Sequence, residues 1–250
     1  MRISFFQELK NSMASADSKR AYNHALFTRV AHEYDSATRL MSLWQDMSWK
    51  RALVDALPLL PNPACVDLAC GTGDVTMLLG NKYPEGQIVG VDLTSSMLDV
   101  ARRRCGSSHV TFAESDMCRT QFPNEWADIV TGSYAIRNAP ALGAALAEVN
   151  RILKPGGIAA FLDFHKPANK FIAACNITLL RWWCGFCGVV IHGAPEHAYI
   201  AASLKKFPDT IQLRAILATY GFSICSSRTF MFGITELLIL QKTSAVKGIV

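Results

Sequence analysis

Two hydrophobic periods alternate along the middle of the chain. Apolar runs typical of buried strands lie at 64–69, 86–93, 109–116, 126–135 and 157–164. Segments with helical periodicity lie between them, at 74–82, from 95 onward and at 141–153, where "KPGG" stops the helix. Strands that alternate with helices predict a doubly wound α/β fold, in which a parallel sheet carries helices on both faces.

Both ends of the chain depart from this alternation. Residues 23–57 predict two amphipathic helices that close at Pro58, and "FSICSSRTFMFG" followed directly by "ITELLILQK" predicts an antiparallel hairpin. We therefore divide the chain into an N-terminal helical lid (1–57), a core (58–168), an apolar cap insertion (169–205), and a C-terminal helix and hairpin (206–242) that complete the core.

The segment at 171–191 has one charge in 21 residues and is long enough to span a membrane. Against a span, Arg181 lies at mid-depth, where a charge is costly, and Asn176 and two glycines dilute the segment. We predict an apolar cap over a pocket. Its aromatic residues would form a substrate wall, although a packed helix explains them nearly as well: Phe171, Trp182, Trp183 and Phe186.

Composition narrows the class of protein. Half of the 250 residues are hydrophobic, and the net charge of +5 is spread along the chain, so no basic face for nucleic acid is expected. "MRISFFQELK" has no apolar run long enough for a secretory signal, so we expect a reduced, cytoplasmic setting for the eight cysteines. Cys184-x-x-Cys187 lacks a second pair, and we predict no metal site.

A glycine loop, "VDLACGTGD", follows the first predicted strand of the core. Gly71 and Gly73 let the backbone turn tightly, and the helix that opens at Asp74 points N–H groups at a ligand. No Gly-Lys-Ser/Thr follows, which excludes a P-loop. A carboxylate at Asp67 would repel a pyrophosphate, yet it suits the ammonium group of S-adenosylmethionine (SAM), which has no phosphate.

Two further acids agree with SAM. Asp92 ends the second predicted strand, where an acid accepts hydrogen bonds from ribose hydroxyls. Asp116 ends the third, where it would accept from the adenine amino group while Met117 packs on the ring. Each acid alone could be a helix cap or a solvated strand end. Together they lie at successive strand ends of one parallel sheet, the edge at which such sheets bind ligands.

These motifs resemble the class I SAM-dependent methyltransferases and, within them, the C-methyltransferases of ubiquinone and menaquinone biosynthesis. The general motifs are "VDLACGTGD", "GVDLTSSML", "ESDM" and "RILKPGG"; the narrower ones are "FTRVAHEYD", "SYAIRNA", "DFHKP" and "AYIAASLKKFP". The resemblance runs from about Phe27 to Leu240. It implies a seven-stranded, mostly parallel sheet with a C-terminal antiparallel hairpin, and an electron-rich aromatic acceptor methylated on carbon.

From the loop and the resemblance together, the candidate SAM-binding residues are Tyr34, Asp67, Ala69, Gly71, Gly73, Asp92, Leu93, Met97, Asp116, Met117 and Ser133. The resemblance places Arg137, Asn138 and Tyr199 toward the acceptor. Arg137 would stabilise a developing phenolate, with His165 or Tyr199 handling the proton. For His165 the alternative is a loop residue bonded to backbone, and for Tyr199 it is packing under the cap.

The chain departs from the family pattern on the acceptor side. Thr38-Arg39 stands where the family usually has Asn-Asp, and "DFHKP" replaces an "EFSKP"-like motif. We predict a SAM-dependent methyltransferase acting on a small lipophilic aromatic acceptor. Methylation of oxygen or nitrogen, a SAM-dependent cyclisation, and a non-catalytic SAM-binding subunit remain alternatives, as do loose peripheral association with a membrane and a homodimer.

Overall fold

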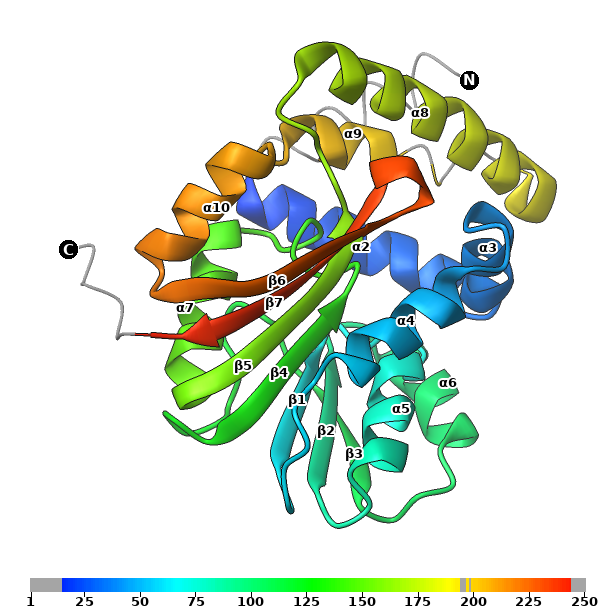
Figure 1. The fold of residues 1–250 in the computed structure, drawn as a ribbon. Coiled ribbons are helices and arrows are strands. Elements are labelled where there is room, and N and C mark those ends of the chain that lie inside the picture. Colours follow the sequence, from blue (N-terminus) through cyan, green and yellow to red (C-terminus); the bar gives the residue numbers. More distant parts are fainter. Residues whose placement is uncertain (1–14, 194–196, 198, 244–250) are drawn as a thin grey trace.

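A seven-stranded sheet forms the centre of the protein (Figure 1). The computed structural model describes residues 15–193, 197 and 199–243. The strands are ordered β3-β2-β1-β4-β5-β7-β6. Their bounds are β1 Ala64–Leu68, β2 Gln87–Asp92, β3 Val110–Glu114, β4 Ala127–Ser133, β5 Leu153–Phe164, β6 Phe222–Phe230 and β7 Thr235–Lys242. Strands β1 to β5 pair in parallel and β7 pairs antiparallel with both β5 and β6. The predicted fold class is confirmed.

Apolar side chains on both faces of the strands explain why helices cover the sheet on two sides. Val66 and Leu68 of β1 belong to a core shared with α7 (Leu142–Ile152) and α10 (Thr210–Thr219). Cys65 belongs to a second core, shared with α4 (Asp46–Asp55) and α5 (Asp74–Lys82). Successive strand residues point to opposite faces, so a continuous apolar run serves both cores. Helix α6 (Ser95–Arg104) packs on β2 and β3.

The N-terminal segment folds into three helices, where the sequence had predicted two. They are α2 (Ala16–Val30), α3 (Tyr34–Met41) and α4. Leu43 and Trp44 adopt positive φ angles of 52° and 62°, which end α3 and turn the chain into α4. Leu and Trp are not turn-forming residues, so the hydrophobic pattern runs through the break without a signal.

Strand β5 begins four residues earlier than expected. It starts at Leu153, directly after α7, and includes the Pro155-Gly156-Gly157 turn that was predicted to precede it. Its pairing with β4 shifts register between Ala127 and Ile129. A bulge of this kind accommodates proline, which lacks an N–H for the ladder.

Four helices lie beyond the carboxyl ends of the parallel strands, at the top of Figure 1: α2, α3, α8 (Lys170–His192) and α9 (Tyr199–Lys206). Helix α8 is long and apolar enough to cross a membrane by length and composition. Here it packs on α9 and α3, and its buried inner side includes Leu180 and Cys184. The short turn η2 (Met231–Gly233), which joins β6 to β7, lies at the same end.

Candidate active site

A small cavity lies at the carboxyl ends of β1, β2 and β4, beneath α2. Its wall includes nine of the residues predicted to bind SAM: Tyr34, Ala69, Gly71, Asp92, Leu93, Met97, Asp116, Met117 and Ser133. They come from six separate parts of the chain, from α3 to the end of β4. The sheet topology alone brings them together, because parallel strands present all their carboxyl ends at one edge.

The glycine loop is held open by its own backbone geometry. Gly71 has a φ of 54°, and a side chain built there would meet no other atom within 4 Å, so the loop backbone faces open space. The Gly71 N–H donates to Asp92 Oδ2 at 2.9 Å, and the Thr94 N–H donates to Asp92 Oδ1 at 2.9 Å. Each carboxylate oxygen has a second lone pair, so Asp92 can still accept from a ligand hydroxyl.

Asp67 and Gly73 are absent from the cavity wall. The Asp67 carboxylate is buried and accepts from the Thr76 and Thr131 hydroxyls, both at 2.7 Å. Burial raises its pKa to about 6. Gly73 caps α5 in a left-handed conformation, and a Cβ there would lie 3.1 Å from the Cβ of Ala101. The structure therefore places these two residues behind the loop, where they support it.

Two amide oxygens point into the structure without a partner among the described residues. The Asn23 side-chain nitrogen donates to the Asn138 carbonyl at 2.8 Å, and the Asn138 side-chain nitrogen donates to the Tyr134 carbonyl at 2.9 Å. Both amide orientations follow from these donations, which leave the two Oδ1 atoms buried and unsatisfied. Both residues line the small cavity. Asn138, predicted to bind the acceptor, therefore lies on the cofactor side.

Helix α2 is tethered across this cavity. The Lys19 ammonium donates to the carbonyls of Arg137 and Ala139 at 2.8 and 2.7 Å, and Arg20 Nε donates to Asp116 Oδ2 at 2.9 Å. The cavity measures only about 80 Å³ in this closed arrangement, below the several hundred Å³ of ordinary small-molecule sites. A nucleoside therefore needs a wider cavity, and we expect the widening to come from α2, which lies across it.

A second, larger cavity of about 600 Å³ adjoins the first, and its wall is mostly apolar. The two cavities share Phe27, Tyr34 and Tyr134, which therefore mark the junction. Tyr134 has a φ of 56°, a strained conformation for an aromatic residue of a kind that is common at functional sites. Burial raises the pKa of both tyrosines, so neither hydroxyl is a base at neutral pH.

Arg137 is the buried cation in the wall of the large cavity. Its backbone N–H and Nε donate to the two Asp163 oxygens at 2.9 and 3.3 Å, and Nη1 donates to the Ser203 hydroxyl. The guanidinium lies over the rings of Phe164 and Tyr199, 5.2 and 5.5 Å from their centroids. Burial disfavours its charge, but Tyr199 and Asp163 outweigh burial and raise the pKa of Arg137. Arg137 thus lies in the wall of the large cavity, and its action on an acceptor stays a prediction.

Tyr199 and Trp183 also line the large cavity, as predicted for the acceptor side. The Tyr199 ring meets Phe27 edge-on at 6.1 Å, and Trp183 Nε1 donates to the Met41 carbonyl at 2.9 Å, which fixes its ring in the wall. His197 joins them, 3% exposed. Sequence reasoning missed it; its only signal was its position next to the "AYIAASLKKFP" motif.

His165 is a correction, because it lines neither cavity. Its Nδ1 lies 2.9 Å from the Gly233 carbonyl, which can only accept, and its Nε2 lies 2.6 Å from the Thr210 hydroxyl. The His165 N–H donates to the Ile234 carbonyl at 2.8 Å. With both ring nitrogens engaged by the protein, His165 anchors the turn η2 and does not act as a base in the cavity.

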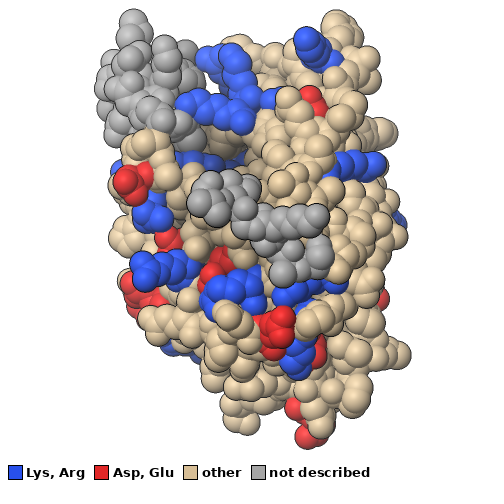
Figure 2. Space-filling model, turned by 90° about the vertical axis from the view of Figure 1, so that its left-hand side faces the viewer, with Lys and Arg blue, Asp and Glu red and all other residues tan. Residues whose placement is uncertain are grey.

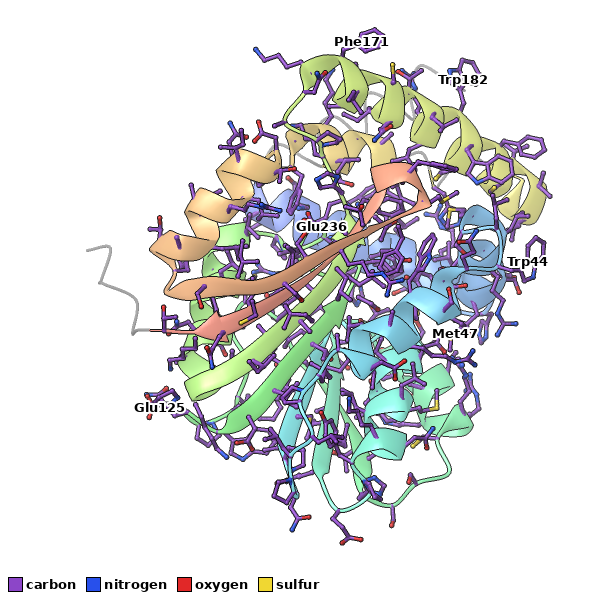
Figure 3. All side chains as sticks on the ribbon, in the orientation of Figure 1. Trp44, Met47, Glu125, Phe171, Trp182 and Glu236 are labelled. Atoms are coloured by element: carbon purple, nitrogen blue, oxygen red, sulfur yellow. The ribbon has the colours of Figure 1, made fainter. Side chains whose placement is uncertain are left out.

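Three of the four aromatic residues assigned to the substrate wall are also corrections. Phe171, Trp182 and Phe186 are 77%, 75% and 60% exposed and do not line the large cavity. Figure 3 shows Phe171 and Trp182 pointing away from the body of the protein. The helical period turns them to the side of α8 opposite Leu180 and Cys184, so the inner wall consists of other residues.

The polar groups in the wall of the small cavity suit SAM. Asp92, Asp116 and the two free amide oxygens are all acceptors, which suits a ligand rich in hydroxyl and amino groups and positive charge. Of the residues that line it, Arg20 is the one Lys or Arg, and Asp116 pairs with it. A phosphate-bearing ligand would find no free cation there.

Fold and site together define a class I SAM-dependent methyltransferase. The sequence model of the ubiE/COQ5 methyltransferase family matches residues 13–242, and the chain belongs to this family. It is 31% identical over 231 residues to the demethylmenaquinone methyltransferase of Symbiobacterium thermophilum, covering 88% of this chain and 92% of that protein. It is 30% identical over 227 residues to the 2-phytyl-1,4-naphtoquinone methyltransferase of Trichormus variabilis, covering 87% and 97%.

Solved structures show the same fold at low sequence identity. A SAM-dependent methyltransferase of Thermotoga maritima superposes with a TM-score of 0.62 at 17% identity, over 88% of this chain and 99% of that one. The cyclase SpnF superposes with a TM-score of 0.61 at 16% identity, over 80% and 82%. These likenesses support the fold alone.

Proposed function

We propose that the protein transfers the methyl group of SAM to a ring carbon of a quinol that carries a lipophilic tail. The observation that supports this most directly is the pair of adjoining cavities. The small cavity is rich in hydrogen-bond acceptors and lies beneath α2. The large cavity is apolar, and Arg137 is the buried Lys or Arg among the described residues in its wall. The relatives named above act on naphthoquinone-type rings, as their names state.

Bound SAM supplies a methyl group on a cationic sulfur, so the acceptor carbon must be nucleophilic. A quinol ring carbon becomes so when the neighbouring hydroxyl loses its proton. Arg137 would stabilise the oxygen's developing charge, because its guanidinium stays charged in this buried position. As the new carbon–carbon bond forms, the sulfur–carbon bond breaks, and the ring carbon then releases its own proton to restore the aromatic ring.

The proton from the hydroxyl needs an acceptor in the wall of the large cavity. We assign it to His197, because its imidazole lies in that wall and histidine is the side chain most often used as a general base. Tyr199 remains the other proposed partner of the acceptor oxygen. Its ring, held between Arg137 and Phe27, also fixes one side of the ring site.

Arg137→Lys tests this assignment. Lysine keeps a positive charge beside Asp163 but loses the planar fork, so kcat with a short-chain demethylnaphthoquinol should fall about a hundredfold, while the Kd for SAM changes little. Ser203→Ala is the matched control, since it removes a partner of Arg137 and leaves the charge in place. A normal kcat with a raised KM would make Arg137 a binding residue only.

Product analysis by mass spectrometry separates the alternatives. Methylation on carbon resists acid hydrolysis and retains the free hydroxyl, methylation on oxygen removes it, and cyclisation leaves the mass unchanged. Absence of any product with SAM bound would favour a non-catalytic subunit. The homodimer stays a prediction, which sedimentation equilibrium tests.

We also propose that the protein acts in the cytoplasm and associates loosely with a membrane surface. A quinol with a long apolar tail resides in the bilayer, and the large cavity is apolar enough to receive it. In this proposal the methyl acceptor is a small lipophilic molecule. Nucleic acid is not a partner.

A further inference from the structure

The mouth of the large cavity is marked by residues that line it and are also exposed to solvent. They are Leu43, Gln45, Leu179 and Phe232, three of them apolar, which come from the α3–α4 turn, α8 and η2. Phe232 is fully exposed. An opening rimmed by apolar side chains from three separate elements is unusual on a soluble surface, where such residues are normally scattered singly.

The two turns at this mouth are strained. Leu43 and Trp44 have φ angles of 52° and 62°, and Met231 and Phe232 have φ angles of 50° and 55°. Glycine or asparagine adopts this conformation readily, whereas bulky residues do so at a cost. Met231 packs against the core, whereas Leu43, Trp44 and Phe232 are exposed at positions where smaller residues would fold better. This indicates that these three side chains serve a purpose outside the fold.

The outer side of α8 extends this apolar surface. Phe171, Trp182, Phe186 and Val190 are exposed along the helix. Figure 3 shows Phe171 at the top, Trp182 at the upper right and Trp44 at the right-hand edge of the molecule, all three projecting outward. We call the set formed by Leu43, Trp44, Phe171, Leu179, Trp182, Phe186, Val190 and Phe232 the docking face. Tryptophan at such a surface is typical of residues that sit at a bilayer interface.

The charge beside the docking face is positive. Between residues 164 and 208 the sequence has Lys166, Lys170, Arg181, Lys205 and Lys206 against one acidic residue, Glu196. Figure 2, which faces the left-hand side of Figure 1, shows Lys and Arg side chains near the top of the molecule, where α8 begins, and further Lys and Arg side chains mixed with acidic ones lower down. Basic residues beside exposed aromatic residues suit a surface of anionic lipid headgroups.

We propose that the docking face seats on the surface of an anionic lipid bilayer and turns the mouth of the large cavity toward the lipid. An acceptor with an apolar tail then enters the cavity without crossing water. The lipophilic substrate in this inference is taken from the proposed function, whereas the docking face is argued from the structure alone. A second copy of the chain fits less well, because it would bring like charges together around the same apolar patch.

Vesicle binding by the full chain tests the proposal. Sedimentation with vesicles of phosphatidylglycerol and phosphatidylcholine should carry the protein down, and vesicles of phosphatidylcholine alone should carry down less. The double variant Trp44→Gly/Trp182→Ser should lower the partition coefficient by about tenfold for each tryptophan removed. The matched control is Leu59→Ser, an equally exposed apolar residue outside the docking face, which should leave partitioning unchanged.

Stability gives an independent readout. Trp44→Gly relieves the positive φ, so its Tm should equal or exceed that of the wild type while its vesicle binding falls. Wild-type binding in the double variant would overturn the proposal. So would a lack of vesicle binding together with a dimer that the double variant dissociates, because a second copy would then cover this face.

Activity separates this proposal from the proposed function. Wild type and double variant should methylate a short-chain, water-soluble quinol at the same rate, since neither tryptophan lines a cavity. With a long-tailed quinol in vesicles, the variant should be slower. Neither protein methylating any quinol would refute the proposed function. If vesicle binding still depended on the two tryptophans, the role of the docking face in membrane binding would nevertheless be supported.

Discussion

At the scale of single residues, Asp67 shows how a buried side chain supports a site that it does not line. The carboxylate lies in the second core layer under the glycine loop and receives two threonine hydroxyls. Burial is the largest influence on it, and raises its pKa to about 6 in spite of those two hydrogen bonds. The ionised Asp67 carboxylate thus lowers the free energy of unfolding, even though its hydrogen bonds help to hold the loop in place.

The pH dependence of stability measures this cost. Because the pKa in the folded state is above the unfolded value of about 3.9, the folded protein binds more protons between the two values. The contribution of Asp67 to the free energy of unfolding therefore falls by about 2 kcal/mol as the pH rises from about 4 to about 6, and by about 3 kcal/mol over the whole titration. Urea unfolding of wild type and Asp67→Asn across pH 4–7 isolates it, since the other groups cancel. A constant difference between the two proteins would contradict the assignment.

The two histidines near the large cavity make a matched pair. His165 is held by Gly233 and Thr210, whereas His197 lies in the cavity wall. His197→Gln should lower kcat about a hundredfold, on the scale of a lost general base. His165→Gln should lower Tm and change kcat by less than about threefold. The reverse pattern would return the base to His165.

These residues also show what the sequence can predict. Asp92 and Asp116 were found because a strand end fixes a position at the sheet edge. The structure agrees with the alternative weighed for His165, a loop residue bonded to backbone, and the sequence could not decide between the two roles because the partners lie 45 and 68 residues away in the chain. Asn23 carried no signal at all, since an asparagine in an amphipathic helix is ordinary until its neighbour is known.

At the scale of elements, a network of charges, buried around Lys50, joins α3 and α4 to the glycine loop. The Lys50 ammonium of α4 lies 3.2 Å from Asp46 Oδ2 and 2.8 Å from Asp74 Oδ2, at the start of α5. Burial disfavours the Lys50 charge, but the two carboxylates outweigh it and raise its pKa. Arg104 continues the network from Asp74 to Asp35 of α3, whose carboxylate also accepts from the Thr72 hydroxyl in the loop.

Lys50→Met should destabilise the protein by about 3–5 kcal/mol, because it leaves Asp46 buried without a cation. It should also weaken SAM binding, since Asp74 follows the glycine loop directly. The control is Arg102→Met, which removes an exposed pair with Asp99 and should cost no more than about 1 kcal/mol. Urea unfolding and calorimetry with SAM measure both effects. Equal losses in the two variants would show that the network adds nothing beyond a surface pair.

Helices whose first residue is set by the local sequence were predicted well, whereas breaks and strand starts that depend on distant contacts were not. Helix α5 begins at Asp74 and α6 at Ser95, as their sequence patterns indicated. The break after α3 and the early start of β5 were missed, because both depend on tertiary pairing: a strained turn at Leu43 and Trp44, and a bulge opposite Ala127. The outward face of α8 was missed because an apolar helix gives no sign of which side is buried.

The whole molecule divides into a sheet that carries the site and helices that close it. All seven strands belong to one sheet with a core on each face, whereas α2 contributes only Leu26 and Val30 as buried residues to a core and is attached to the site by hydrogen bonds from Lys19, Arg20 and Asn23. Part-buried hydrogen bonds at the rim of a site open more easily than a core packed on both faces. The molecule can therefore open above the cofactor cavity while its sheet stays intact.

Hydrogen exchange tests this division. Without SAM, amides of β1, β4 and β5 should be the slowest to exchange, and those of α2 markedly faster. SAM must lift α2 to enter the cavity of about 80 Å³ and then give the free oxygens of Asn23 and Asn138 a donor, so saturating SAM should slow exchange in α2 at least tenfold. Exchange in α10, which packs on β6 away from the cavity, should not change. Asn23→Leu keeps the size of the side chain but removes the acceptor, and should abolish the protection of α2 while α6 and the glycine loop remain protected. Protection of α2 that survives in this variant would show that the helix closes over SAM by packing alone.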